Sequence, residues 1–122
     1  MKRCHIFDII DPDEAWKSMN NEIVERYGSE CNGHYLFTWD DGDRMLARCK
    51  KCGAYILIQR SEFHSMFDDD SYYRDYFPVS GPEEARMLNQ QYSGWGIEKM
   101  FPERYLMRSD GSCSWSKEHE LK

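Results

Sequence analysis

Two pairs of potential metal-ligand residues, one on each side of a short hairpin pattern, constrain this chain more than any other feature. Cys31-Asn32-Gly33-His34 and Cys49-Lys50-Lys51-Cys52-Gly53 each carry two ligand side chains with two residues between them, and fourteen residues (35–48) separate the pairs. The intervening chain holds Asp40-Asp41-Gly42-Asp43 between the alternating runs 35–39 and 44–48. Asp-Gly between alternating runs is typical of a β-hairpin with a two-residue turn.

A turn at Asp41-Gly42 predicts a register in which the numbers of facing residues add up to 83. The strand pairs expected on this basis are Trp39 with Arg44, Phe37 with Leu46, and Tyr35 with Arg48. The same register places His34 opposite Cys49 and Cys31 opposite Cys52. It therefore brings both ligand pairs to the open end of one hairpin.

Three thiols and one imidazole match the preference of zinc for four ligands at tetrahedral geometry. The chain has five cysteines, an odd number that favours metal ligation over a disulfide framework. We expect one structural Zn²⁺ bound by Cys31, His34, Cys49 and Cys52. The residues that could substitute for His34 as the fourth ligand are Cys4, His5, His64 and Cys113.

The Cys-x-x-His and Cys-x-x-Cys-Gly pairs resemble the knuckles of zinc-ribbon proteins, a fold group with many unrelated functions. This resemblance covers residues 31–59. The wider run from Arg48 to His64, together with Tyr76–Ser80, looks like small uncharacterised bacterial and phage proteins. The zinc-ribbon resemblance implies a zinc-bearing antiparallel ribbon, and neither resemblance implies a particular activity.

The remaining pattern predicts a single α+β domain over 1–122, with a zinc-ribbon-type antiparallel sheet packed against two helices. Asp11 followed by Pro12 is typical of a helix start, and Gly28 of a helix end. A second helix start lies at Pro82-Glu83-Glu84. The expected segments are a helix over 11–28, the ribbon hairpin and third strand over 31–59, an acidic and aromatic segment over 61–79 with 61–67 helical, a second helix over 80–94, and strands within 96–116.

The net charge of −6 disfavours nucleic acid as a general partner, because phosphate affinity comes from Lys and Arg. No apolar run is long enough to predict a membrane-spanning helix, and we expect a cytoplasmic protein. The sequence contains no phosphate loop, nucleophile elbow or metalloprotease motif. We therefore expect a binding protein that is not an enzyme.

An acidic and aromatic surface is the expected working face. Carboxylates among aromatic rings can dock on a basic groove in place of phosphates. The residues assigned to this face are Asp68, Asp69, Asp70, Tyr72, Tyr73, Asp75 and Tyr76. The most concrete hypothesis is a small inhibitor or adaptor, similar in style to anti-CRISPR and other counter-defence proteins, that binds a basic nucleic-acid-handling protein.

Two alternative functions remain open at this point. The first is a nucleic-acid-associated zinc ribbon with a regulatory role, in which the nucleic-acid strand is contacted by Trp39, Arg48, Lys50 and Lys51. The second is a small metalloenzyme, which requires a metal position open to water.

Overall fold

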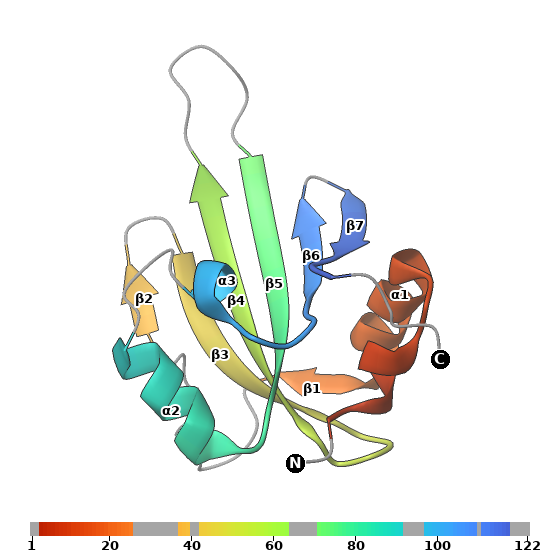
Figure 1. Ribbon diagram of the computed structural model, residues 1–122, viewed down its shortest axis with the longest axis horizontal. Coiled ribbons are helices and arrows are strands. Elements are labelled where there is room, and N and C mark those ends of the chain that lie inside the picture. Colours follow the sequence, from red (N-terminus) through yellow and green to blue (C-terminus); the bar gives the residue numbers. More distant parts are fainter. Residues whose placement is uncertain are drawn as a thin grey trace.

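The computed structural model of the protein describes residues 3–25, 37–39, 42–63, 71–91, 97–109 and 111–117. Within these residues the chain forms one antiparallel sheet of seven strands, in the order β1-β3-β4-β5-β6-β7 with β2 paired to β3 (Figure 1). The elements in chain order are η1 (His5–Asp8), α1 (Pro12–Glu22), β1 (Ile23–Glu25), β2 (Phe37–Trp39), β3 (Gly42–Cys49), β4 (Tyr55–Phe63), β5 (Ser71–Val79), α2 (Pro82–Gln91), α3 (Ile97–Met100), β6 (Leu106–Ser109) and β7 (Ser112–Trp115). The α+β class is confirmed, with helices packed on an antiparallel sheet.

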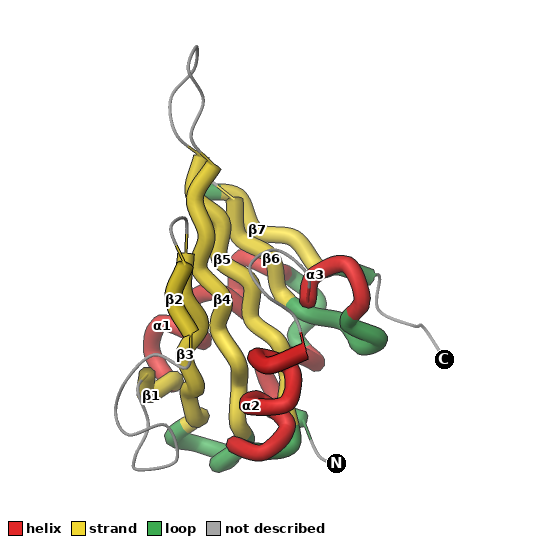
Figure 2. The backbone as a smooth tube through the Cα atoms, turned by 90° about the vertical axis from the view of Figure 1, so that its left-hand side faces the viewer, coloured by secondary structure: helices red, strands yellow, loops and turns green. Residues whose placement is uncertain are grey.

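Helices cover both faces of the sheet. Figure 2 shows α2 and α3 on one side of the strands and α1 on the other. The α1 face is filled by a cluster that includes Ile6, Phe7, Met45, Ile58 and Tyr76. The α2 face is filled by a second cluster, Leu46, Leu57, Phe77, Val79, Ala85, Ile97 and Tyr105. The sheet therefore separates two cores.

The central strand β4 explains this two-sided burial. Successive side chains of a strand point to opposite faces, so Ile56 and Ile58 enter the α1 core while Leu57 enters the α2 core. All three side chains are fully buried. The third strand expected within 31–59 is therefore β4, a strand covered on both faces that lies between β3 and β5.

The first helix begins as predicted and ends early. The Asp11 side chain accepts a hydrogen bond from the Asp13 backbone N–H at 3.4 Å, and Pro12 occupies the first turn. The expected end at Gly28 is wrong, because the chain turns into β1 directly after Glu22. The β-branched pair Ile23-Val24 leaves the helix to bond with β3, where Ile23 pairs with Cys49.

The hairpin forms, but its predicted register is wrong by two residues. Phe37 pairs with Arg44 and Trp39 with Gly42, so facing numbers add up to 81 instead of 83. The rest of this β3 edge is occupied by β1, which pairs with Ala47, Arg48 and Cys49. The strand that faces Cys49 therefore comes from the end of α1, and the register that placed His34 there does not hold.

Two further expectations change in the second half of the chain. Residues 61–63 continue β4 and are not helical, while 64–67 lie outside the described residues. The aromatic-rich run 71–79 forms β5, a central strand that pairs with both β4 and β6. Within 96–116, where strands are expected, residues 97–100 form the short helix α3, whereas α2, β6 and β7 lie within their predicted segments.

We predict that Leu57→Ala lowers the free energy of unfolding by about 2–5 kcal/mol, because the fully buried leucine side chain that it removes leaves a cavity in the α2 core. Urea denaturation followed by circular dichroism measures the change. The matched control is Met87→Ala on α2, whose side chain is 55% exposed. A similar loss in both variants would contradict the two-core packing.

Candidate metal centre

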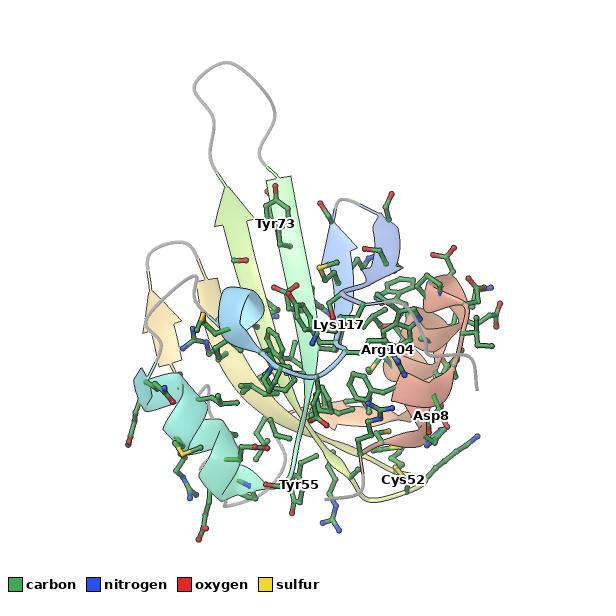
Figure 3. All side chains as sticks on the ribbon, in the orientation of Figure 1. Asp8, Cys52, Tyr55, Tyr73, Arg104 and Lys117 are labelled. Atoms are coloured by element: carbon green, nitrogen blue, oxygen red, sulfur yellow. The ribbon has the colours of Figure 1, made fainter. Side chains whose placement is uncertain are left out.

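Four potential metal ligands gather where the N-terminal segment meets the connection between β3 and β4. The ligand atoms of Cys4, His5, Cys49 and Cys52 all lie within 4.8 Å of one another. Cys4 and Cys49 are buried, whereas His5 and Cys52 are exposed. Figure 3 labels Cys52 in the β3–β4 connection, close to the N-terminal segment that carries Asp8.

A tight turn presents the two N-terminal ligands. Cys4 precedes η1, and its carbonyl accepts a hydrogen bond from the Phe7 backbone N–H at 3.1 Å. Ile6 and Phe7 are fully buried in the α1 core. Their burial holds the preceding Cys4-His5 pair against the end of the sheet.

The other two ligands belong to a knuckle at the end of β3. The Gly53 N–H donates to the Cys49 carbonyl at 2.9 Å, and the Cys49 N–H donates to the Ala54 carbonyl at 2.9 Å. Gly53 has φ of +76°, in the left-handed region that glycine adopts without strain. The Cys-x-x-Cys-Gly sequence therefore closes the turn with Cys49 and Cys52 directed toward Cys4.

The geometry and chemistry of this donor set fit zinc. Two sulfurs bound to one tetrahedral zinc at about 2.3 Å lie about 3.8 Å apart. The Cys4 sulfur lies 3.4 Å from the Cys52 sulfur and 3.8 Å from His5 Nδ1. Three thiolates and one imidazole would hold Zn²⁺ in a closed structural site.

A buried carboxylate supports the histidine from behind. Glu22, the last residue of α1, places Oε1 3.3 Å from His5 Nε2 and 3.0 Å from Lys51 Nζ. Its backbone carbonyl also accepts from the Lys50 N–H at 2.8 Å. Nε2 therefore faces the carboxylate while Nδ1 faces the sulfurs, the arrangement that orients a metal-binding histidine.

The charge distribution favours thiolate at the exposed edge of the cluster. Burial raises the pKa of the Cys4 thiol well above its usual range. Burial also acts to raise the pKa of Cys52, but hydrogen bonds from the Ala54 backbone and from His5 outweigh it and lower that pKa to about 6. Burial acts to raise the pKa of Glu22 as well, but the Lys51 ammonium and the His5 ring outweigh this effect and lower the pKa of the carboxyl group. Metal binding would release the proton of Cys4.

A cavity of about 520 Å³ adjoins the cluster. Its lining residues include Arg3, Asp8, Tyr55 and Ser80 together with the two exposed ligand residues.

The Arg48 guanidinium lies 5.2 Å from the centre of the Tyr55 ring and donates to the Gly53 carbonyl at 3.1 Å. Arg48 thus stiffens the knuckle.

The sequence assigned two of these four residues to the site. Cys49 and Cys52 are brought together as expected, while Cys31 and His34 lie outside the described residues. Cys4 and His5 entered only as substitutes for the fourth ligand. The signal that favours them is the adjacent Cys-His pair before a buried Ile-Phe pair, but nothing in the sequence places it beside the knuckle.

The residues expected to contact a partner are dispersed. Asp68, Asp69 and Asp70 lie outside the described residues. On β5, Tyr72 is exposed and Tyr73 half-buried, whereas Asp75 and Tyr76 are buried on opposite faces of the sheet. Asp75 and Tyr76 therefore belong to the interior.

The basic residues of the alternative nucleic-acid site are partly engaged within the fold. Arg48 binds the knuckle and Lys51 pairs with Glu22, while Lys50 is exposed. The side chain of Trp39 lies outside the described residues.

Comparisons with protein-family models, with curated proteins and with solved structures find no match for this chain. The Cys-His cluster is consistent with a zinc-ribbon-like motif, and no family is identified. Among the described residues, no helix is both long and apolar enough to span a membrane.

We predict that Cys4→Ser and Cys52→Ser each abolish stoichiometric zinc binding, because each removes one of four ligands. Native mass spectrometry of the purified protein measures metal content and should report one zinc in the wild type. Cys113→Ser is the control, since Cys113 lies outside the cluster. Cys31→Ser distinguishes the two ligand sets: it should retain zinc, and a loss of zinc in Cys31→Ser but not in Cys4→Ser would assign the site to the other set.

We predict that Glu22→Gln weakens zinc affinity about 10- to 100-fold, because the amide keeps the shape of the carboxylate but removes its charge from His5 Nε2. Competition with a chromophoric chelator measures the affinity. Glu14→Gln is the matched control, since Glu14 lies on the exposed face of the same helix and pairs with Lys17. Equal affinities of wild type and Glu22→Gln would contradict the supporting role of this carboxylate.

Proposed function

We propose that this protein is a zinc-stabilised binding module without catalytic activity. The observation that carries the proposal is the four-ligand cluster of Cys4, His5, Cys49 and Cys52. Four protein ligands complete a tetrahedral shell and leave no position for a reactive water, so the metal would act as a structural link. It would tie the N-terminal turn to the β3–β4 knuckle.

The working surface that we propose is acidic. The chain carries 22 acidic residues against 16 Lys and Arg, which supports a partner with a basic surface. In the most specific form of the proposal, that partner is a nucleic-acid-handling protein. This chain would act on it as an inhibitor or an adaptor, in the manner of counter-defence proteins. Of the two tyrosines on β5 that were assigned to this face, Tyr72 is exposed and Tyr73 half-buried. Tyr72 shares its face with Arg74, so we propose Tyr73 for the contact with a basic partner.

Native mass spectrometry of the tagged protein, purified from its own host, tests this proposal because it reports bound metal and retained partners together. One zinc and a basic protein in the same complex would support it. Retained nucleic acid without a protein would favour the zinc-ribbon alternative. Turnover of a substrate that chelation abolishes would favour the metalloenzyme.

We predict that replacing Asp68–Asp70 with asparagine weakens binding to a basic partner identified in this way and flattens its salt dependence, because three carboxylates are removed from the proposed face. Isothermal titration at several salt concentrations measures both quantities. The charge-matched control replaces three exposed acids elsewhere, as Asp13→Asn, Glu14→Gln and Glu83→Gln. Wild-type affinity in the Asp68–Asp70 variant would remove this face from the proposal.

A further inference from the structure

Three arginines stand side by side across neighbouring strands of the sheet. Arg60 of β4 faces Arg74 of β5, and Arg74 faces Arg108 of β6. Asp43 of β3 faces Arg60 at one end, and Cys113 of β7 faces Arg108 at the other. We call Arg60, Arg74 and Arg108 the arginine row. Tyr73, which is labelled in Figure 3, precedes Arg74 on β5 and shows how far along this strand the arginine row lies.

The arginine row belongs to the α1 face of the sheet. It lies two residues along the strands from Ile58, Tyr76 and Leu106, which are buried in the α1 core, and residues two apart share a face. Each arginine is only half-buried, unlike the residues of that core. In Figure 1 the ends of β4 and β5 extend beyond α1. The row therefore lies where the covered core gives way to accessible surface.

Contacts within the fold hold two of these guanidinium groups in place. Arg108 stacks on the Trp16 ring, 3.6 Å from its centre, and its Nη1 lies 3.2 Å from the Cys113 sulfur. Arg74 Nη1 donates to the Tyr76 hydroxyl at 3.3 Å. An anion that binds here would meet guanidinium groups that are already positioned, so less conformational entropy would be lost on binding.

The charge pattern of the row favours an anionic ligand. The row places three guanidinium groups on directly facing positions of neighbouring strands, which gathers positive charge on this part of the sheet. Guanidinium groups bind phosphates through paired N–H donors. Successive phosphates of one nucleic-acid chain would match the succession of arginines along the row.

An exposed aromatic ring lies beside this charge. Tyr72 is 55% exposed and stands two residues from Arg74 on the same strand, so that both side chains share a face. A basic stripe beside an aromatic ring is the combination that binds single strands, whose phosphates pair with the charges while a base stacks on the ring. An acidic protein segment has no base to occupy Tyr72.

We propose that the arginine row and Tyr72 bind single-stranded nucleic acid. This site differs from the one expected from the sequence at Arg48, Lys50 and Lys51, where Arg48 and Lys51 hold the knuckle instead. The proposal does not depend on the function proposed above, because it requires neither the basic partner nor the metal. In a complex with a nucleic-acid-handling protein, this face would contact the strand itself.

Fluorescence anisotropy with a labelled oligothymidine of about 12 nucleotides tests the site on the zinc-loaded full chain. Three phosphate contacts give a slope of log affinity against log salt of about −2, so affinity should fall about 20-fold between about 50 and 200 mM salt. Arg60→Gln, Arg74→Gln and Arg108→Gln should each weaken binding and reduce the slope by about 0.7. Tyr72→Ala should weaken binding at least about five-fold and leave the slope unchanged.

Arg86→Gln is the charge-matched control, because Arg86 is exposed on α2, on the opposite face of the sheet. Melting temperatures measured in parallel identify a variant that does not fold, and the other two row variants then carry the test. The proposal is overturned by absence of binding at low salt, by equal losses in Arg86→Gln and the row variants, or by a polyglutamate peptide that binds as tightly as the oligonucleotide. None of these results would affect the zinc content or the binding of a basic protein.

Discussion

The contact between the N-terminal turn and the β3–β4 knuckle is the interaction on which the rest of this structure depends. Cys4 and His5 meet Cys49 and Cys52 there, within the reach of one ion. β1 pairs with the last residues of β3, and Glu22 connects α1 to the same point through both its carboxylate and its carbonyl. A zinc ion at this junction would restrain three elements at once, and metal binding would then contribute directly to folding.

The two faces of the sheet use arginine in different ways. On the α2 face, Arg44 is fully buried, and its Nε donates to Gln59 Oε1 at 2.8 Å while its Nη1 reaches Asn89 of α2. A buried charge requires such partners, so Arg44 joins the helix to the sheet. On the α1 face, the arginine row stays half-buried and accessible. The first arrangement is explained by packing, and for the second we propose a ligand.

The proposed functions fit one molecule with three distinct regions. The metal cluster lies at the knuckle end of the sheet, and the arginine row lies toward the opposite ends of β4 and β5. The acidic segment Asp68–Asp70 follows β4 in the chain. An overall acidic charge limits nonspecific attraction to nucleic acid, so binding at the arginine row would depend on these local guanidinium groups and would weaken as salt is added.

The sequence by itself determined the local features of this protein: the cap at Asp11, the hairpin, the covered strand β4, the Cys-x-x-Cys-Gly knuckle and the second helix. Each depends on neighbouring residues, whose conformational preferences and periodicity are visible in the chain. Only the tertiary structure decided which strand borders Cys49, because β1 competes for that edge from a distant segment. It alone brought Cys4 and His5 to the knuckle and aligned three arginines. Such juxtapositions depend on strand order and register, and no local pattern of residues encodes either one.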